Sequence, residues 1–335
     1  MKRFDEKVFN GEVFARYSKT IADPVKTRLI EAGVFYADPD LVSRLPEQVG
    51  GNYITRPITG LLSGEPVVYD GNTDIDDGKL NTYSQGLGAI GFAKSFTERD
   101  FTVSISGKDF MMEVVAQVAR YWQKHNQKVL LAILKGIFAS ALAGNVKDVA
   151  GASATDINDV CRDVAGDNAD MFEVVFMHSG LAKEYEKIQV LKYALENSEE
   201  GMIKPSQIGY LNGRLVIIDD SCPVADGANS SKIYTSYILG RNAFCYQPLP
   251  VEVPAEMARD AKTKGGQTSL VTRERFVLAP EGVSLKQSAY ASKTSLAISD
   301  LETGSNWELV NDGTDPISLK VVPLCAMKST ITPSA

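Results

Sequence analysis

The fold of this chain depends on the stretch Phe110-Met-Met-Glu-Val-Val-Ala-Gln-Val-Ala-Arg-Tyr-Trp122, continued by Val129-Leu-Leu-Ala-Ile-Leu-Lys-Gly-Ile-Phe138. Apolar residues recur along it at every third or fourth position, the period of one face of an α-helix. Ser106-Gly-Lys-Asp109 can cap the start and Gly144-Asn145 the end, with residues 124–126 as the place for a break. The pattern predicts a helix of about 35 residues, roughly 50 Å long at 1.5 Å per residue. Such a length exceeds the globular average, so we expect the other layers to pack on this helix.

Shorter helices and strands occupy the rest of the chain. Apolar periodicity predicts helices over 155–164 and 179–193, and short apolar runs predict buried strands. The elements lack the regular strand–helix alternation of a doubly wound sheet, so the expected fold class is α+β. The expected strands are 172–177, 215–218, 233–239, 243–246, 269–278 and 319–322.

Residues 50–101 form a glycine-rich segment in which β-formers alternate with polar residues. This composition predicts a long β-hairpin or extended excursion. The segment has too few large apolar residues for a core of its own, and exposed apolar strands are an aggregation hazard in a monomer. We therefore expect another surface to bury its apolar residues, which are Ile54, Leu61, Leu62, Val67, Val68 and Tyr69.

The composition excludes several classes of protein. Hydrophobic residues make up 44% and charged residues 23% of the chain, as in ordinary globular proteins. No apolar run reaches the ~18 residues of a membrane span, and the N-terminus lacks the apolar core of a secretory signal. The formal net charge is −7 with no dense Lys/Arg cluster. This charge argues against a nucleic-acid-binding face and suits the lining of a container that holds DNA without binding it tightly.

Cysteine and histidine are too few and too scattered for a metal site. The chain has two histidines, and its four cysteines form no C-x-x-C spacing. A structural zinc site or a disulfide framework is therefore not expected. We expect reduced, buried thiols and no bound metal or cofactor. The residues concerned are His125, His178, Cys161, Cys222, Cys245 and Cys325.

The stretch Gly86-Leu-Gly-Ala-Ile-Gly91 matches the dinucleotide-binding fingerprint G-x-G-x-x-G. That site needs a buried strand before the glycines and a helix after them, so that the helix N-terminus meets the pyrophosphate. Residues 81–85 make a poor buried strand, and 92–106 favour an extended chain. We therefore interpret the glycines as flexible joints in an extended loop.

The acidic stretch Asp70-Gly-Asn-Thr-Asp-Ile-Asp-Asp-Gly78 resembles a calcium-binding loop. Such a loop needs glycine where this chain has Ile75, and glutamate where it has Asn81. We interpret the stretch as an acidic turn at the tip of the hairpin.

Two polar pairs follow predicted buried strands. His178-Ser179 suggests a hydrolase, but sequence neighbours rarely face each other as a triad requires, and the chain has no G-x-S-x-G elbow. Ser179 is instead expected to cap a helix.

Asp219-Asp220 is the most enzyme-like feature, because open α/β enzymes place acidic ligands at strand ends. These residue types also favour a plain turn, and without a third ligand we assign no catalytic, metal-binding or cofactor-binding residue.

Five stretches between residues 110 and 285, taken together and in this order, resemble the major capsid proteins of tailed bacteriophages. Each stretch alone is weakly specific, and their number and order carry the resemblance. They are residues 121–138, Val174-Val-Phe-Met-His-Ser179, Gly213-Arg-Leu-Val-Ile-Ile-Asp-Asp220, Tyr234-Thr-Ser-Tyr-Ile-Leu-Gly240 and Thr272-Arg-Glu-Arg-Phe-Val-Leu278.

The resemblance implies the HK97-like capsid fold, which is α+β. Residues 1–48 would be an N-terminal arm and 49–101 an extended β-hairpin, the E-loop. Residues 102–170 and 266–335 would form a peripheral domain that carries the long spine helix. Residues 171–265 would form the axial domain at the centre of a capsomer.

The resemblance also implies a structural protein and not an enzyme. Such a subunit self-assembles, as pentamers and hexamers, into the icosahedral shell that encloses a phage genome. Its implied partners are further copies of itself, a portal, decoration proteins and double-stranded DNA enclosed without sequence-specific binding, with no membrane. A separate scaffolding protein is expected because the chain begins at the arm. Its implied location is the virion capsid, assembled in the cytoplasm of the bacterial host.

Three alternatives stay open at this point. An encapsulin-like cellular compartment uses the same fold to enclose a cargo enzyme. A metal-dependent hydrolase would use Asp219 and Asp220. A tail-tube protein is a third possibility, which the long predicted helix disfavours.

Overall fold

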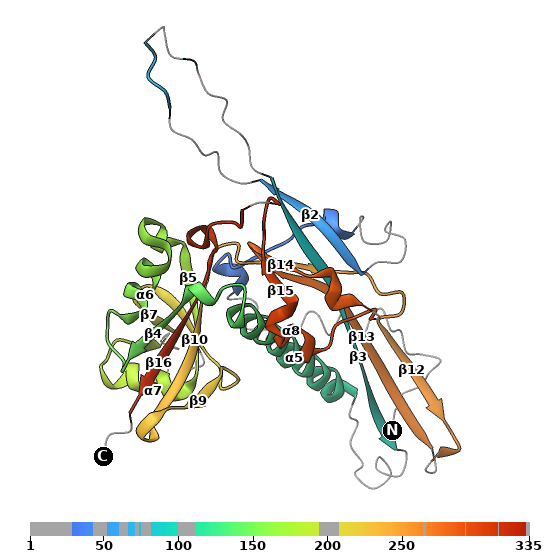
Figure 1. Cartoon of the computed structure of the whole chain (residues 1–335). Coiled ribbons are helices and arrows are strands. Elements are labelled where there is room, and N and C mark those ends of the chain that lie inside the picture. Colours follow the sequence, from blue (N-terminus) through green and yellow to red (C-terminus); the bar gives the residue numbers. More distant parts are fainter. Residues whose placement is uncertain are drawn as a thin grey trace.

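The helix α5, Met111–Ala139, lies between two β-sheets in the computed structural model of the chain (Figure 1). It spans 29 residues without interruption, so the predicted long helix is confirmed and the break at 124–126 is wrong. Two of the residues there contact neighbouring strands: the His125 ring packs edge-on against Phe92, and Asn126 Nδ2 donates to Glu274 Oε2 at 3.1 Å. The structure describes residues 29–42, 52–59, 66–70, 74, 82–99, 111–193, 208–263, 266–291, 293–313 and 315–332.

One sheet has six strands in the order β1-β11-β13-β3-β2, with β12 paired to β13 as well. Strands β3 and β13 run antiparallel from the Gln267–Arg99 pair to the Val277–Ala89 pair and make this sheet a long ribbon beside α5 (Figure 1). Trp122 of α5 joins the ribbon, since its indole Nε1 donates to Thr272 Oγ1 at 3.0 Å. The strands are β1 (Phe35–Tyr36), β2 (Tyr53–Thr59), β3 (Thr82–Arg99), β11 (Phe244–Pro248), β12 (Ala255–Asp260) and β13 (Gln267–Pro280).

Strands β2 and β3 form the predicted hairpin. They pair antiparallel from Tyr53–Gly88 to Thr59–Thr82. Ile54 is buried in the chain's own core together with Leu87 and Val277, so the expectation that it needs a separate surface is wrong. The helix cap at 106–109, Leu61 and Leu62, and all of the acidic turn except Asp70 and Asp74 lie outside the described residues.

The second sheet has eight strands in the order β4-β16-β10-β5-β8-β7-β6, with β9 paired to β10. Helices α6 (Asp156–Ala165) and α7 (Ser179–Lys187) bury their apolar sides on one face of this sheet, and α5 lies on the other. Side chains alternate along each strand, so Cys325 and Met327 face α6 and α7 while Leu324 and Ala326 face α5. The strands are β4 (Val146–Ala150), β5 (Phe172–Met177), β6 (Lys192–Tyr193), β7 (Ile208–Leu211), β8 (Arg214–Ile218), β9 (Val224–Asp226), β10 (Lys232–Gly240) and β16 (Leu324–Ile331).

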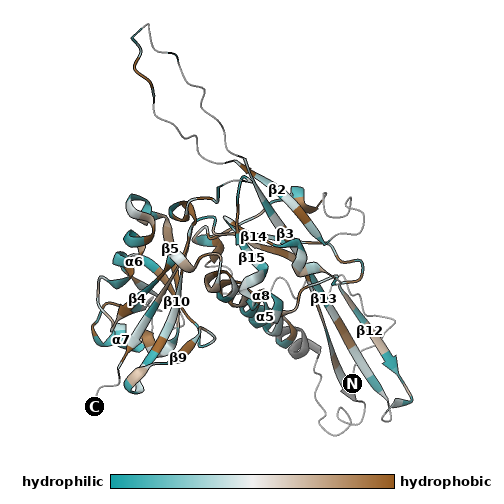
Figure 2. Ribbon diagram, in the orientation of Figure 1, coloured by the Kyte–Doolittle hydropathy of each residue, from teal (hydrophilic) through white to brown (hydrophobic). Residues whose placement is uncertain are grey.

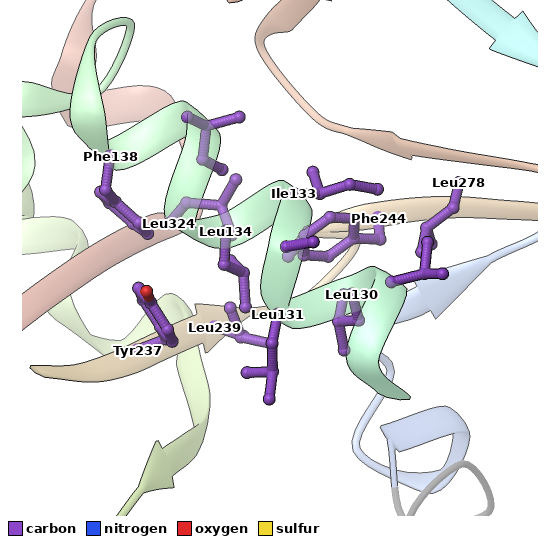
Figure 3. Close-up of a cluster of buried hydrophobic side chains, with 14 of the residues drawn as sticks. Leu130, Leu131, Ile133, Leu134, Phe138, Tyr237, Leu239, Phe244, Leu278 and Leu324 are labelled. Carbon is purple, nitrogen blue, oxygen red and sulfur yellow. The ribbon is translucent and has the colours of Figure 1, made fainter. Parts of the chain in front are cut away.

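The main core lies around the second half of α5, where hydrophobic colours concentrate in Figure 2. Figure 3 shows Leu130 and Ile133 directed towards Phe244 and Leu278 of the six-stranded sheet. From the same helix Leu131, Leu134 and Phe138 point towards strands of the eight-stranded sheet, and the Phe138 and Tyr237 rings stack with centroids 5.6 Å apart. Burying one such side chain stabilises the folded state by about 1.5–3 kcal/mol. Helix α5 therefore joins two sheets that share no strand.

Most predicted elements are confirmed, and two are wrong. The predicted strand 319–322 is a 3₁₀ turn at Leu319–Val321, and the strand begins only at Leu324, because Pro323 has no N–H to donate to a sheet. The predicted helix 179–193 ends at Lys187, and residues 192 and 193 form strand β6. The remaining elements are α8 (Ile298–Glu302) and the two-stranded sheet of β14 (Val283–Leu285) and β15 (Trp307–Leu309).

The division into arm, E-loop, peripheral domain and axial domain stays a prediction. The sheet topology concerns one part of it, the assignment of strands β4 and β16. Strands β4 and β16 come from ranges that the prediction gives to the peripheral domain. Both are hydrogen-bonded into the sheet that contains β5, β8 and β10. Sequence order did not reveal this, because β16 returns from the C-terminal end of the chain to a position between β4 and β10.

Candidate functional site

The two acidic residues Asp219 and Asp220 lie where the parallel strands β5 and β8 end, at the start of α7. The Asp219 backbone N–H donates to the Met177 carbonyl at 2.9 Å. Its carboxylate accepts from the Ser221 N–H at 2.8 Å and from the side-chain amide of Gln127 on α5. Asp219 is therefore fully engaged in holding a turn against α5.

Asp220, His178 and Ser179 meet at the first turn of α7. The Ser179 N–H donates to Asp220 Oδ1 at 3.3 Å, and His178 Nε2 lies 3.8 Å from the same oxygen. The helix cap is His178 and not Ser179 as predicted, because His178 Nδ1 accepts from the Gly180 N–H at 2.9 Å. The imidazole can cap because its backbone is extended, the usual conformation of an N-cap residue.

This constellation suits a turn better than catalysis. Hydrogen bonds from Ser179 hold the pKa of Asp220 below its usual value, so the carboxylate is a weak base, and its side chain is 74% exposed. Burial raises the pKa of the Cys222 thiol well above its usual value, and the negative charges of Asp219 and Asp220 raise it further. The Cys222 thiol is therefore not an activated nucleophile. Within the described part of the chain no three His, Cys, Asp or Glu side chains are grouped to hold a metal ion.

Asp220→Ala should change the free energy of unfolding by no more than about 1 kcal/mol, because the side chain is exposed and its interactions are screened by water. The depressed pKa means that the carboxylate stabilises the fold above its unfolded-state pKa of ~3.9 and loses this effect at lower pH. The difference between variant and wild type should therefore shrink as the pH falls through about 4. Urea unfolding at neutral and acidic pH measures both effects, and a loss of several kcal/mol would contradict the assignment as a surface turn.

The glycines of the G-x-G-x-x-G match lie inside strand β3, and no helix follows them there, so no pyrophosphate site forms. Their interpretation as flexible joints is wrong. A Cβ at Gly86 would lie 2.5 Å from the Leu285 carbonyl oxygen, and one at Gly88 would lie 2.2 Å from the Tyr290 hydroxyl. Glycine is required here because other parts of the chain approach the strand closely.

A polar cluster that the sequence did not reveal lies at the base of the β2–β3 hairpin. We call its five members, Tyr36, Asp38, Arg56, Gln85 and Glu281, the Arg56 cluster. The Arg56 guanidinium of β2 donates to the Tyr36 hydroxyl at 2.8 Å, to Gln85 Oε1 at 2.7 Å and to Glu281 Oε2 at 3.0 Å. Those bonds are made by Nη2, and the second terminal nitrogen, Nη1, lies 3.4 Å from Asp38 Oδ2. The members come from four separated segments of the sequence, so no local motif predicts the cluster.

The cluster is mostly shielded from water, and of the three guanidinium nitrogens of Arg56 only Nε has no hydrogen-bond partner among the described residues. The side chain of Arg56 is 14% exposed and that of Glu281 is 27% exposed. Burial, together with Glu281, raises the pKa of Tyr36 well above its usual value, so its hydroxyl stays protonated and donates to Glu281 Oε2. Gln85 is fully buried and donates to the carbonyls of Pro280 and Val283. The cluster therefore fixes the hairpin to the turn after β13.

Beyond this base, the described part of the hairpin loop carries exposed apolar side chains. Val68 is 75% exposed and Tyr69 is 91% exposed. Among the residues that the structure describes, no element covers these two side chains, whereas Ile54 at the base is buried. Apolar side chains left this exposed on an extended segment are typical of a surface that another molecule covers.

The chain is 30% identical over 298 residues to the major capsid protein of Bacillus phage SPP1, which covers 87% of this chain and 88% of that protein. This chain belongs to the family of phage major capsid proteins. No protein-family model matches it. As a major capsid protein it is a structural component of the virion, and the encapsulin-like and hydrolase alternatives are disfavoured.

Solved phage structures share the fold of this capsid protein. The capsid of Ralstonia phage GP4 aligns with a TM-score of 0.56 at 11% identity, covering 74% of this chain and 83% of that one. The head structure of Helicobacter pylori bacteriophage KHP40 aligns with a TM-score of 0.54 at 12% identity, covering 89% and 86%. At identities this low the likeness shows the fold alone. The shared fold confirms the predicted HK97-like α+β class. Among the described helices, none has the length and hydrophobicity to cross a membrane.

Proposed function

We propose that this capsid protein self-assembles, through the β2–β3 hairpin among other contacts, into the icosahedral shell of a phage head, and that it has no enzymatic activity. The exposure of Val68 and Tyr69 on the hairpin loop carries the proposal. A neighbouring subunit that covered these side chains would supply the burial that the chain itself does not provide. Repeated head-to-tail contacts of this kind close into rings, and rings tile a shell.

Several finer points belong to the same proposal. The shell encloses double-stranded DNA without sequence-specific binding, in keeping with the net charge of −7. A separate scaffolding protein, a portal and decoration proteins act as partners, and assembly takes place in the cytoplasm of the host. The arm, E-loop, peripheral and axial divisions predicted from the sequence apply, with β4 and β16 assigned to the axial sheet because they pair with its strands.

Wild-type protein, alone or with a candidate scaffold, should form hollow icosahedral particles or five- and six-fold rings, seen by light scattering and negative-stain microscopy. The double variant Val68→Asp with Tyr69→Asp should keep the wild-type melting temperature and lose particle formation, because charged groups resist burial at an interface.

Tyr69→Phe is the matched control, since it keeps the apolar ring and should still assemble. A wild-type chain that stays monomeric with every scaffold tested would contradict the shell. Normal assembly of the double aspartate variant would instead show that the hairpin loop is not among the contacts that build the shell.

A further inference from the structure

The first half of α5 carries three exposed cations on one side. Arg120, Lys124 and Lys128 follow one another at intervals of four residues, so the helix places them on one face, about 6 Å apart along its axis. Lys135, further along α5, pairs with Glu302, but none of these three forms an ion pair with a residue that the structure describes. Like charges at this spacing destabilise an isolated helix, so an anionic partner would stabilise this one.

An exposed aromatic ring lies beside these cations. Tyr121 is 37% exposed, and its ring packs edge-on against Phe96 with centroids 5.4 Å apart and stacks on His125 at 6.2 Å. Because its neighbours already hold the ring, covering it costs little side-chain entropy. Tyrosine is enriched in protein–protein interfaces. We call this ring and the three cations the basic face of α5.

The outer side of α6 carries the opposite charge. Asp159 and Asp163 are exposed and four residues apart on α6, and Asp167 and Asp170 are exposed on the 3₁₀ segment that follows. None of the four has an ion-pair partner within the described part of the chain. Arg162 is the one cation among the residues of α6, all of which the structure describes. We call the four carboxylates the acidic face of α6.

The two faces lie on opposite sides of the eight-stranded sheet. Helix α6 buries its apolar side on one face of this sheet, and α5 packs on the other (Figure 1). The basic face therefore finds its complement not within its own subunit but on a second copy of the chain. When one surface of a protein fits a different surface of an identical copy, the contact is head-to-tail and can close into a ring.

We propose that the basic face of α5 binds the acidic face of α6 on a neighbouring copy of this chain. The inference rests on the shell proposed above and adds a second contact to that of the hairpin loop. The shared spacing of four residues lets successive cations meet successive carboxylates, as charged side chains do along the flanks of packed helices. One such contact neutralises two sets of charges that a lone subunit leaves unpaired. It sets the register of neighbouring subunits, and salt weakens it.

A carbodiimide, which joins a lysine to a carboxylate only where the two groups touch, tests the contact in assembled wild-type particles. The particles are grown from a mixture of isotope-labelled and unlabelled subunits. Mass spectrometry should find Lys124 or Lys128 joined to a carboxylate of the acidic face, in peptide pairs that combine one labelled and one unlabelled partner. Particles in which other lysines are joined across subunits and these two are not would overturn the proposal.

Reversal of the charges provides a second measurement. Lys124→Glu with Lys128→Glu should lower the particle yield at least about tenfold, because carboxylates would then face carboxylates across the contact. Adding Asp163→Lys and Asp167→Lys to the same chain gives the two faces opposite signs again and should restore the yield. Both aspartates lie at the C-terminal end of α6, where a cation suits the helix dipole. The melting temperature of unassembled subunits should stay close to wild type, since all four positions are exposed.

Lys183→Glu with Lys192→Glu is the matched control, because it changes the net charge equally at two other exposed positions and should assemble normally. A normal yield after the reversal on α5, or a lost yield that the reversal on α6 does not restore, would overturn the contact. Normal yield with loss of retained DNA would overturn it too and assign the basic face to phosphate groups. Assembly of the wild-type chain is measured separately, so a failure of this contact is distinguishable from a failure of the shell.

Discussion

Gly136→Ala is expected to prevent this capsid protein from reaching a stable fold. Gly136 lies in the second half of α5, where a Cβ atom would stand 2.1 Å from the Leu301 carbonyl oxygen and 2.8 Å from Trp307 Nε1. The Trp307 indole donates to that same carbonyl at 2.9 Å, so the added methyl group would push apart a buried hydrogen bond. Overpacking costs about 1–3 kcal/mol or more, and a buried unsatisfied group costs about 1–3 kcal/mol in addition. Together these approach the whole stability of a domain, about 5–15 kcal/mol.

Gly91→Ala is the matched control for this prediction. Gly91 lies in strand β3, and its added Cβ would meet nothing nearer than 3.8 Å. Soluble yield and melting temperature of the two variants should differ sharply, with Gly91→Ala close to wild type. An unchanged melting temperature for Gly136→Ala would show that α8 can move away from α5 at little cost.

The contrast between these two glycines illustrates what the sequence of this protein reveals. The apolar stripe predicts α5 because a helix signals itself within a few turns. The contact of Gly136 with α8 joins segments that are far apart in the sequence, and nothing local to Gly136 marks it. Strand 172–177 was likewise predicted correctly from a short apolar run, and its position beside β10 and β8 was not.

The candidate site follows the same rule. The sequence correctly predicted an extended chain after the G-x-G-x-x-G match, but it assigned flexibility to glycines, among them Gly86 and Gly88, that other segments approach closely. Ser179 was chosen as a helix cap because serine is a common one, whereas His178 takes that position. Asp220 and His178 were treated as separate candidates, although the adjacent ends of β5 and β8 bring them together. Contacts between distant segments decide the packing around the glycines and the meeting of Asp220 with His178, whereas the cap at His178 is a local contact with Gly180.

Arg56→Met is expected to leave the two sheets folded while reducing particle assembly by at least about tenfold, which corresponds to about 1.4 kcal/mol of lost association free energy. Methionine has a similar length and cannot donate the hydrogen bonds that tie β2 to Tyr36, Gln85 and Glu281. Removing one partner of a shielded ion pair leaves the other charge unpaired, and for Glu281, which is partly exposed, we expect a cost of about 1–3 kcal/mol. The cost falls on the base of the hairpin, and none of the five residues of the Arg56 cluster belongs to the core around Ile133 and Leu134 that holds the sheets together.

A variant that breaks a single exposed ion pair provides the control for Arg56→Met, which breaks two shielded ones. Lys135→Met removes the contact of Lys135 with Glu302, whose side chains are 53% and 36% exposed, and such surface pairs contribute about 0–1 kcal/mol. Particle yield by light scattering and the melting temperature of unassembled subunits should be measured for both variants. Arg56→Lys should give an intermediate yield, since an ammonium group reaches fewer of the acceptors than a guanidinium does.

Arg56→Met subunits that assemble at wild-type yield would show that the hairpin takes its direction from the neighbouring subunit. Loss of yield at an unchanged subunit melting temperature would instead mean that the direction is set within each subunit, by the Arg56 cluster, before assembly begins.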